Sequence, residues 1–274
     1  MKLKHSVVAI AVAALFAGSV FAQGSGSVSK VDVSNINQGQ AGLLNKQEMD
    51  IGNAKSGGKS DVKVGNINQG QAGLLNSQKM AIGNAEGKGS QSKVNVGNIN
   101  QGQAGLLNKQ EMAVGNAAGG GKSDVKVGNI NQGQAGLLNS QKMAIGNAEG
   151  KGSQSKVNVG NINQGQAGLL NKQEMAVGNA ASGGKSDVKV GNINQGQAGL
   201  LNSQKMAIGN AETKGVSKVV IGNVNQGQAG LLNKQEMNIG NAASGGKSDV
   251  KLGNVNQGQA GLLNTQKMNV GNAN

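Results

Sequence analysis

The chain has no cysteine, proline, tryptophan or tyrosine, and its 274 residues include only two phenylalanines and one histidine. Without cysteine no disulfide can form, so stability must come from hydrogen bonding and packing. With a single histidine and no cysteine, metal sites and nucleophile–base pairs lack their usual members, and the acidic residues do not converge. No glycine-rich nucleotide motif and no nonapeptide calcium repeat is present. We therefore expect neither enzyme activity nor a cofactor.

The first 22 residues differ in composition from the rest of the chain. Lys2 and Lys4 form a basic start, residues 6–18 are largely apolar, and small residues at Val20 and Ala22 suit cleavage by a signal peptidase. We predict a secretory signal peptide at residues 1–22, followed by a Gly/Ser leader at residues 23–29. A retained membrane anchor is the alternative, but the apolar run is shorter than the roughly 20 residues that a spanning helix needs. The mature chain is expected to be secreted, with no membrane span.

Removal of this segment takes away both phenylalanines, the only histidine and two of the lysines. The mature chain then has 24 lysines, no arginine and 13 acidic residues, which gives a net charge of +11. This charge can attract an anionic polysaccharide non-specifically, although a merely solvated surface is the simpler interpretation. Without arginine or aromatic rings the chain can neither pair with bases in bidentate fashion nor stack on them, so no specific nucleic-acid partner is expected.

One stretch, NINQGQAGLLNKQEMDIGNA at residues 35–54, recurs eight times with small changes. Each copy is marked by the asparagine that opens its N-[IV]-N-Q-G-Q run: Asn35, Asn66, Asn98, Asn129, Asn161, Asn192, Asn223 and Asn254. The intervals are 31 or 32 residues, and such a period is typical of a stack in which each unit buries its apolar face against its neighbours. The 48 glycines would also suit a disordered chain, but disorder gives no reason to keep a strict register. The repeat region is predicted to span residues 30–274.

Alternation of residue types within a copy predicts strands. In copy one we expect a strand at residues 30–33, a corner at 34–35, a second strand at 36–40, a turn at 41–42 and a third strand at 43–51. Each copy would then be one coil of a β-solenoid, or one serpentine layer of a cross-β stack. The fold class is therefore all-β.

The third strand shows which of its faces points inward. One parity is constant in all eight copies except for Ile/Val exchange at its last position, and in copy one it comprises Leu43, Asn45, Gln47, Met49 and Ile51. The other parity varies, as an outer face does. Good helix formers are abundant here, but the apolar residues do not recur at helical spacing, which favours the strand.

Charges at variable positions predict how the copies stack. The row that begins at Glu48 alternates in sign through every copy: Glu48, Lys79, Glu111, Lys142, Glu174, Lys205, Glu236 and Lys267. A second row, from Lys30 to Asp249, alternates in the same way. If one repeat forms one layer, with parallel in-register strands, every charge lies between opposite charges, whereas two repeats per layer would stack like on like. We therefore predict one repeat per layer.

In such a stack, identical amides lie above one another. Hydrogen bonds between them would form amide ladders along the axis, as in cross-β assemblies, and would satisfy polar groups that are costly to bury unpaired. The residues that we assign to this ladder in the first four copies are Asn45, Gln47, Asn76, Gln78, Asn108, Gln110, Asn139 and Gln141. Asn35 and Asn53 are expected instead to cap turns.

Two apolar rows allow more than one interpretation. The methionines equivalent to Met49 could serve metal or redox chemistry, but soft core filling is the simpler role. The leucines equivalent to Leu44 lie on the outer parity, where they would form an exposed stripe that binds filaments side by side, unless the turn rotates them inward.

We expect neither end of the repeat region to be capped, so that a second copy can dock head to tail. Such docking would bring Asp249 beside Lys30, Lys251 beside Asp32, and Lys267 beside Glu48. Each of these contacts joins opposite charges. The predicted partner is therefore the chain itself, in a heterologous contact that does not close.

The motif Gln40-Ala41-Gly42-Leu43-Leu44-Asn45 matches Q-x-G-x-x-N, the core of the curlin repeat, and Ser34 stands six residues before its glutamine. The chain resembles the bacterial functional amyloids, curlin-like or Fap-like. It departs from them in the glycine that replaces this serine in copies two to eight and in its longer repeat. The resemblance implies an exported subunit that polymerises into surface or biofilm fibres, with a nucleator or export machinery as further partners.

Two functions from different classes follow. The first is a secreted structural protein that assembles head to tail into extracellular amyloid-like fibres for adhesion or a biofilm matrix. The alternative is a soluble, monomeric β-solenoid that binds polysaccharide or ice with a flat, regular face.

Overall fold

The structure is a computed structural model that describes most of the repeat region. The described residues are 28–52, 58–83, 89–115, 121–146, 152–178, 184–211, 214–242 and 245–271. The predicted signal peptide, residues 23–27 of the leader and Asn53 lie outside them. The first described strand begins at Val28, two residues before the predicted start of the repeat region.

Every element of regular secondary structure in the described residues is a β-strand, and the strands form two parallel sheets. One sheet contains β1 (Val28–Ala41), β3 (Lys59–Ala72), β5 (Gln91–Ala104), β7 (Lys122–Ala135), β9 (Gln154–Ala167), β11 (Lys185–Ala198), β13 (Val216–Ala229), β15 (Lys247–Leu252) and β16 (Val255–Ala260). The other contains β2 (Leu44–Ile51), β4 (Leu75–Ile82), β6 (Leu107–Val114), β8 (Leu138–Ile145), β10 (Leu170–Val177), β12 (Leu201–Ile208), β14 (Leu232–Ile239) and β17 (Leu263–Val270). No helix that could cross a membrane occurs in the part of the chain that the structure describes.

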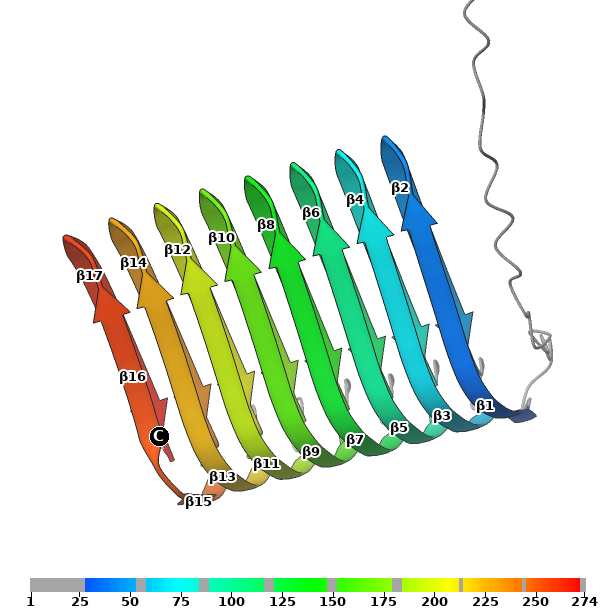
Figure 1. Ribbon diagram of the computed structural model, residues 1–274. Coiled ribbons are helices and arrows are strands. Elements are labelled where there is room, and N and C mark those ends of the chain that lie inside the picture. The colour runs from blue at the N-terminus through cyan, green and yellow to red at the C-terminus, as the bar shows by residue number, and fades with distance from the viewer. Residues whose placement is uncertain are drawn as a thin grey trace, which may run out of the picture.

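Each repeat forms one layer of a β-solenoid, which confirms the predicted fold class. β1 pairs with β3 and β2 with β4, both in parallel, so that Val31 lies beside Val62 and Asn45 beside Asn76. The same register continues through all eight layers. In each layer the long strand curves at the base and rises along one face, and the short strand returns behind it (Figure 1).

The core lies between the two sheets and is built from the inward parity of both. In the second layer Val62, Ile67 and Ile82 are completely buried, as is nearly all of Met80. These side chains, or others of similar size, repeat in every layer, so each apolar group packs on equivalent groups of the adjacent layers. β-branched residues suit such columns because they fit closely on a pleated surface.

The corner predicted at residues 34–35 does not separate two strands in the first seven copies. In copy two the inward residues are Ser60, Val62 and Val64 before the corner, and Ile67, Gln69 and Gln71 after it. The inward parity therefore shifts at Gly65-Asn66, where the strand bends without ending. Only copy eight is divided, into β15 and β16. The expectation of two separate strands was wrong because pairing with the next layer is interrupted only at the corner residue and resumes at once, as at Asn35 and Asn66.

The assignment of Leu43 to the inward face was also wrong. β2 begins at Leu44, and Leu43 lies in the turn with 71% of its surface exposed. Leu44 is exposed as well, at 74%. Constancy at Leu43 thus reflects the turn rather than the core.

A second corner follows each short strand and depends on glycine. Gly146, for example, has a φ of 60°, and a Cβ there would lie 2.1 Å from Cγ2 of Val157. L-residues with side chains rarely adopt this backbone conformation, and the core leaves no room for one.

Candidate functional site

The predicted amides lie in continuous ladders between the sheets. Asn45 Nδ2 donates to Asn76 Oδ1 at 3.0 Å, and Gln78 Nε2 donates to Gln47 Oε1 at 3.0 Å. Asn108, Gln110, Asn139 and Gln141 extend the two ladders with bonds of 2.9 Å. Asn76 Nδ2 also donates to Gly73 O and Ala104 O, so the same amide closes the turn. The asparagine ladder therefore joins layers and holds the leucine turns in place.

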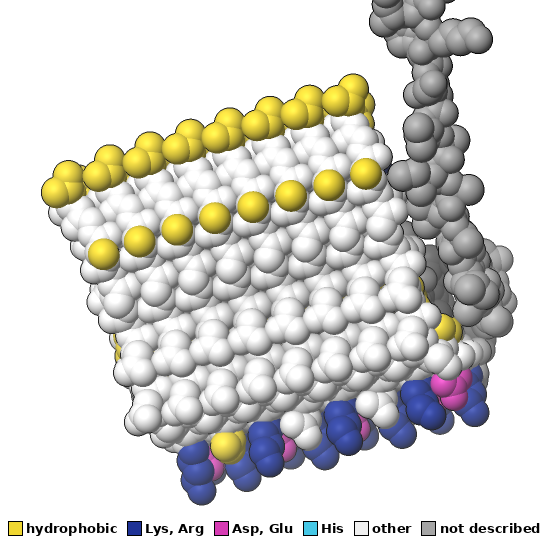
Figure 2. Space-filling view, viewed as in Figure 1, with side chains coloured by type: hydrophobic (Ala, Val, Ile, Leu, Met, Phe, Trp, Pro, Cys, Tyr) yellow, Lys and Arg dark blue, Asp and Glu magenta, His cyan; other side chains and the backbone are white. Residues whose placement is uncertain are grey.

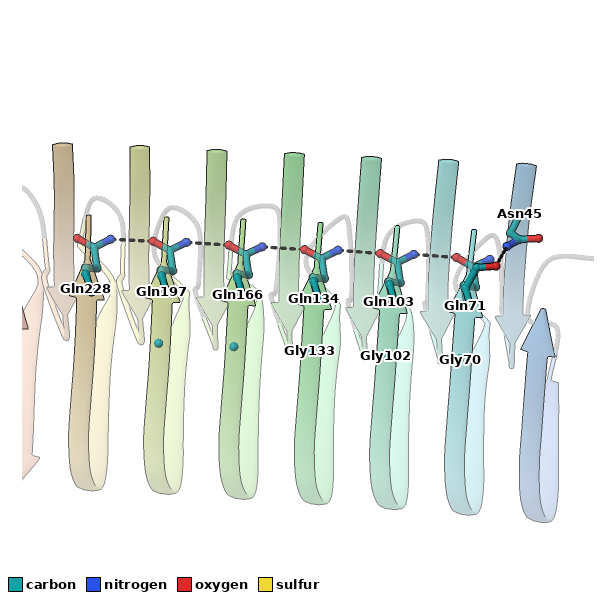
Figure 3. Close-up of a pocket in the computed structure, with 18 of the residues that line it drawn as sticks. Asn45, Gly70, Gln71, Gly102, Gln103, Gly133, Gln134, Gln166, Gln197 and Gln228 are labelled. Carbon is teal, nitrogen blue, oxygen red and sulfur yellow. Dashed lines mark hydrogen bonds between the residues drawn. The ribbon is translucent and has the colours of Figure 1, made fainter. Parts of the chain in front are cut away.

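Two further buried ladders were missed in the sequence. Gln69 Nε2 donates to Gln38 Oε1 at 2.8 Å, and Gln71 Nε2 donates to Gln40 Oε1 at 3.0 Å. Figure 3 shows the second ladder continuing from Gln71 to Gln228. Gln38 and Gln40 alternate with their neighbours in step with Ile36, so the sequence placed all three on one face of the strand. Nothing in the polar N-Q-G-Q run indicated that this face is internal.

Asparagines on the outer side of the long strands also bond between layers. Asn68 Nδ2 donates to Asn37 Oδ1 at 2.7 Å, and Asn66 Nδ2 donates to Asn35 Oδ1 at 3.1 Å. The backbone N–H of Asn66 donates to the same oxygen of Asn35. The bonds observed at Asn35 therefore tie the corner of one layer to the corner of the next, whereas the turn-capping role that the sequence predicts for it stays a prediction.

The ladders have a direction. Every glutamine ladder donates from one layer to the layer before it, as Gln69 does to Gln38, whereas the Asn45 ladder donates the opposite way. The first layer thus directs Nε2 of Gln38 toward its outer edge. The last layer directs Oε1 of Gln257 outward, because Gln257 Nε2 already bonds to Gln226. One edge of the stack offers donors where the other offers acceptors.

The alternating charges lie side by side, but few come within ion-pair distance. Glu48 and Lys79 are register neighbours and lie 3.5 Å apart. Glu111 also lies beside Lys79 in register, yet its carboxylate pairs with Lys109 of its own strand at 3.0 Å. The other members of the row keep the same alternation of neighbours: Lys142, Glu174, Lys205, Glu236 and Lys267. These exposed charges act mainly by avoiding like-charge contact.

The residues predicted at a head-to-tail junction lie on the outermost described strands. Lys30 and Asp32 are exposed on β1, and Lys63 Nζ lies 3.8 Å from Asp32. Asp249 and Lys251 lie on β15 at the other end. These two groups occupy opposite ends of one sheet, so a single chain does not bring them together.

No described residue covers the edge of the eighth layer that faces away from the seventh. Met268 is 44% exposed, whereas its neighbour Met237 is completely buried. Val255 and Leu252, equivalent to fully or nearly fully buried residues of inner layers, are only half-buried. In the first layer Val31 and Ile36 are likewise half-buried. Another layer stacked on either edge would bury this apolar surface.

On the face that Figure 2 shows, the chemistry of the surface changes from base to rim. Charged side chains gather along the base of the stack, and hydrophobic rows run along the rim and across the face above it (Figure 2). The rim contains the exposed leucines of the turns, such as Leu106 and Leu107 at 45% and 40% exposure. A groove lined mainly by glycine, glutamine and alanine runs the length of the face formed by the long strands, and a second is lined by asparagine, glutamine and glycine. The methionine row, by contrast, is buried in the core from Met49 to Met237.

No group of three or more acidic, histidine or cysteine side chains that could hold a metal ion occurs among the described residues. Comparison with protein-family models, with curated proteins and with solved structures gives no match.

Proposed function

We propose that this chain is a secreted structural protein whose copies dock head to tail into amyloid-like fibres at a cell surface or in an extracellular matrix. The observation that supports the proposal is the complementarity of the two outer edges. Each edge has an open row of backbone groups and half-exposed apolar columns in the described residues, and open strand edges are templates for pairing with another chain.

The side chains at the edges match in hydrogen bonding as well as in charge. In-register docking would let Gln38 Nε2 donate to Gln257 Oε1 of a second copy, and Asn264 donate to Asn45. It would also set Asp249 beside Lys30 and Lys267 beside Glu48. The junction would then repeat the contacts of an internal layer, which is how a heterologous contact extends without closing.

The roles of the Q-x-G-x-x-N residues support the resemblance to curlin-like or Fap-like functional amyloids. Gln71 forms a buried ladder, and Asn76 combines a ladder with the closing of the turn. At Gly73 a Cβ would lie 1.7 Å from the carbonyl oxygen of Gly42, so the motif glycine permits the close approach of layers. Each motif residue therefore has a function in stacking.

Secretion follows from the predicted signal peptide at residues 1–22. A nucleator or export machinery would be the further protein partners of such a subunit, and an anionic polysaccharide would be attracted by the lysines along the base. No catalytic role is proposed.

The test is the behaviour of the purified mature chain, residues 23–274, over days at high concentration. We expect unbranched fibres by electron microscopy, increased thioflavin fluorescence and a meridional reflection near 4.8 Å, the spacing of parallel strands. A discrete monomer by sedimentation, with no fibres, would reject the proposal and favour the soluble binding module.

A further inference from the structure

Two rows of glycine allow the layers to approach closely. In the turn row, a Cβ on Gly73 would lie 1.7 Å from the carbonyl oxygen of Gly42 in the preceding layer. In the corner row, a Cβ on Gly65 would lie 1.8 Å from the carbonyl oxygen of Ser34. The same distance is 2.0 to 2.4 Å at the later members of the corner row, Gly97, Gly128, Gly160, Gly191, Gly222 and Gly253. Real Cβ atoms essentially never show contacts under 3.0 Å.

These corner glycines do not adopt a positive φ, so packing rather than backbone conformation requires them. In each case the missing Cβ would point toward the preceding layer. A side chain is therefore compatible with this position only where no layer precedes it.

Ser34 is the one member of the corner row that is not glycine. It lies on β1, the outermost described strand of its sheet, and it is exposed. By the geometry of the row, its Cβ lies on the side of β1 away from β3. This is the side on which a second copy would dock.

Within one chain, the carbonyl of Gly222 lies against Gly253 of the next layer. Docking in register would place the carbonyl of Gly253 from the second copy against Ser34 in the same way. The Cβ of Ser34 would then be far inside contact distance of that oxygen, and the two backbones would have to separate at the corner. The bond equivalent to that from Asn66 N to Asn35 Oδ1, which is 3.2 Å in the first pair of layers, would be stretched. The turn row makes no such conflict, because Gly42 is glycine.

We propose that Ser34 is a steric gate on the docking of a second copy at the N-terminal edge. The inference depends on the proposed head-to-tail assembly and deepens it: charges and amides select the partner edge, and Ser34 makes the junction looser than an internal layer. Opening of the corner then limits the rate at which each copy adds.

The experiment compares the mature wild-type chain with S34G and S34A. Sonicated wild-type fibres seed each monomer, elongation is followed by thioflavin fluorescence, and the residual monomer is measured by sedimentation. We expect S34G to elongate about fivefold faster, equal to about 1 kcal/mol in the barrier, and to leave less monomer. S34A keeps the Cβ, so it should elongate as the wild type does. Melting curves of the fresh monomers check that the three chains are equally folded.

Equal elongation of S34G and wild type would overturn the inference while leaving the proposed function intact. Acceleration of S34A to the rate of S34G would also overturn it, because the hydroxyl rather than the Cβ would then be responsible. If, without seeds, S34G assembles and the wild type and S34A do not, Ser34 blocks docking completely. That result would support the inference and reject fibre formation by the natural chain. Failure of all three chains to assemble would reject both.

Discussion

At the scale of single residues, the core is unusual in containing amides as well as apolar groups. Gln110 is completely buried, yet it donates to Gln78 and accepts from Gln141. Buried amides are costly unless their groups are paired, and for Gln110 both of these partners are identical residues in adjacent layers. A single layer could not form this core.

Replacement of Gln110 by Leu tests the ladder. The change leaves Gln78 Oε1 and Gln141 Nε2 without their bonds in a buried site, so we expect a loss of about 2–4 kcal/mol of unfolding free energy. Urea denaturation of the fresh monomer measures it. Asn68→Ala is the matched control, since Asn68 belongs to an exposed ladder and its removal should cost well under half as much. Equal losses would contradict a role for burial.

Glycine at the second corner gives another residue-scale prediction. Gly146→Ala adds a Cβ where φ is 60° and Val157 lies 2.1 Å away, so we expect destabilisation of more than about 2 kcal/mol. Gly133→Ala is the control, because a Cβ there meets nothing within 4 Å on the outer face. Removing glycine from a strand should leave stability unchanged or raise it by about 0.5–1 kcal/mol. Thermal melts of the two variants should therefore shift in different directions or by very different amounts.

At the scale of elements, adjacent strands are held in register partly by the alternation of charge. Glu111 lies between Lys79 and Lys142, and a slip of two residues would instead place Lys109 beside Lys79. The individual ion pairs are exposed, so their attraction contributes little. The alternation matters because the observed order of strands keeps like charges apart in both charge rows, the one that begins at Glu48 and the one that begins at Lys30.

Substitution of Glu111 by Lys makes three consecutive lysines in that row. We expect a loss of about 0.5–1 kcal/mol at low ionic strength, which should largely disappear in about 1 M salt because exposed charges are then screened. Denaturation curves at the two salt concentrations measure this difference, and Glu111→Gln serves as the uncharged control. A loss that does not depend on salt would indicate a packing effect instead.

At the scale of the whole molecule, the two-repeat pattern of charge predicts which deletions are tolerated. Deletion of residues 98–160 removes two repeats and keeps every row alternating. Deletion of residues 98–128 removes one repeat and brings Lys79 beside Lys142 and Lys93 beside Lys156. We expect the longer deletion to fold and assemble as the full chain does, and the shorter one to be less stable at low salt. Melting temperature and fibre yield measure both, and the opposite order would contradict the role of alternation.

The sequence by itself determined the architecture. The period of 31 or 32 residues indicated stacked units, the alternation around Val31 and Met49 indicated strands, and the sign changes from Glu48 to Lys79 indicated one repeat per layer. These patterns are sufficient to predict the architecture because strand periodicity and like-charge repulsion act between near neighbours. In this stack, the neighbours of each repeat are other copies of the same repeat.

Only the tertiary structure decided which constant residues are internal. Leu43 is as constant as Gln47, yet the turn exposes it, and Gln69 is buried although it lies in a polar run. Gly70 and Gly65 look alike in the sequence, but a Cβ on the first meets nothing within 4 Å and a Cβ on the second meets the layer before it. The difference depends on backbone atoms a full repeat away, and the distance between layers at each corner is set by the packing of the whole stack.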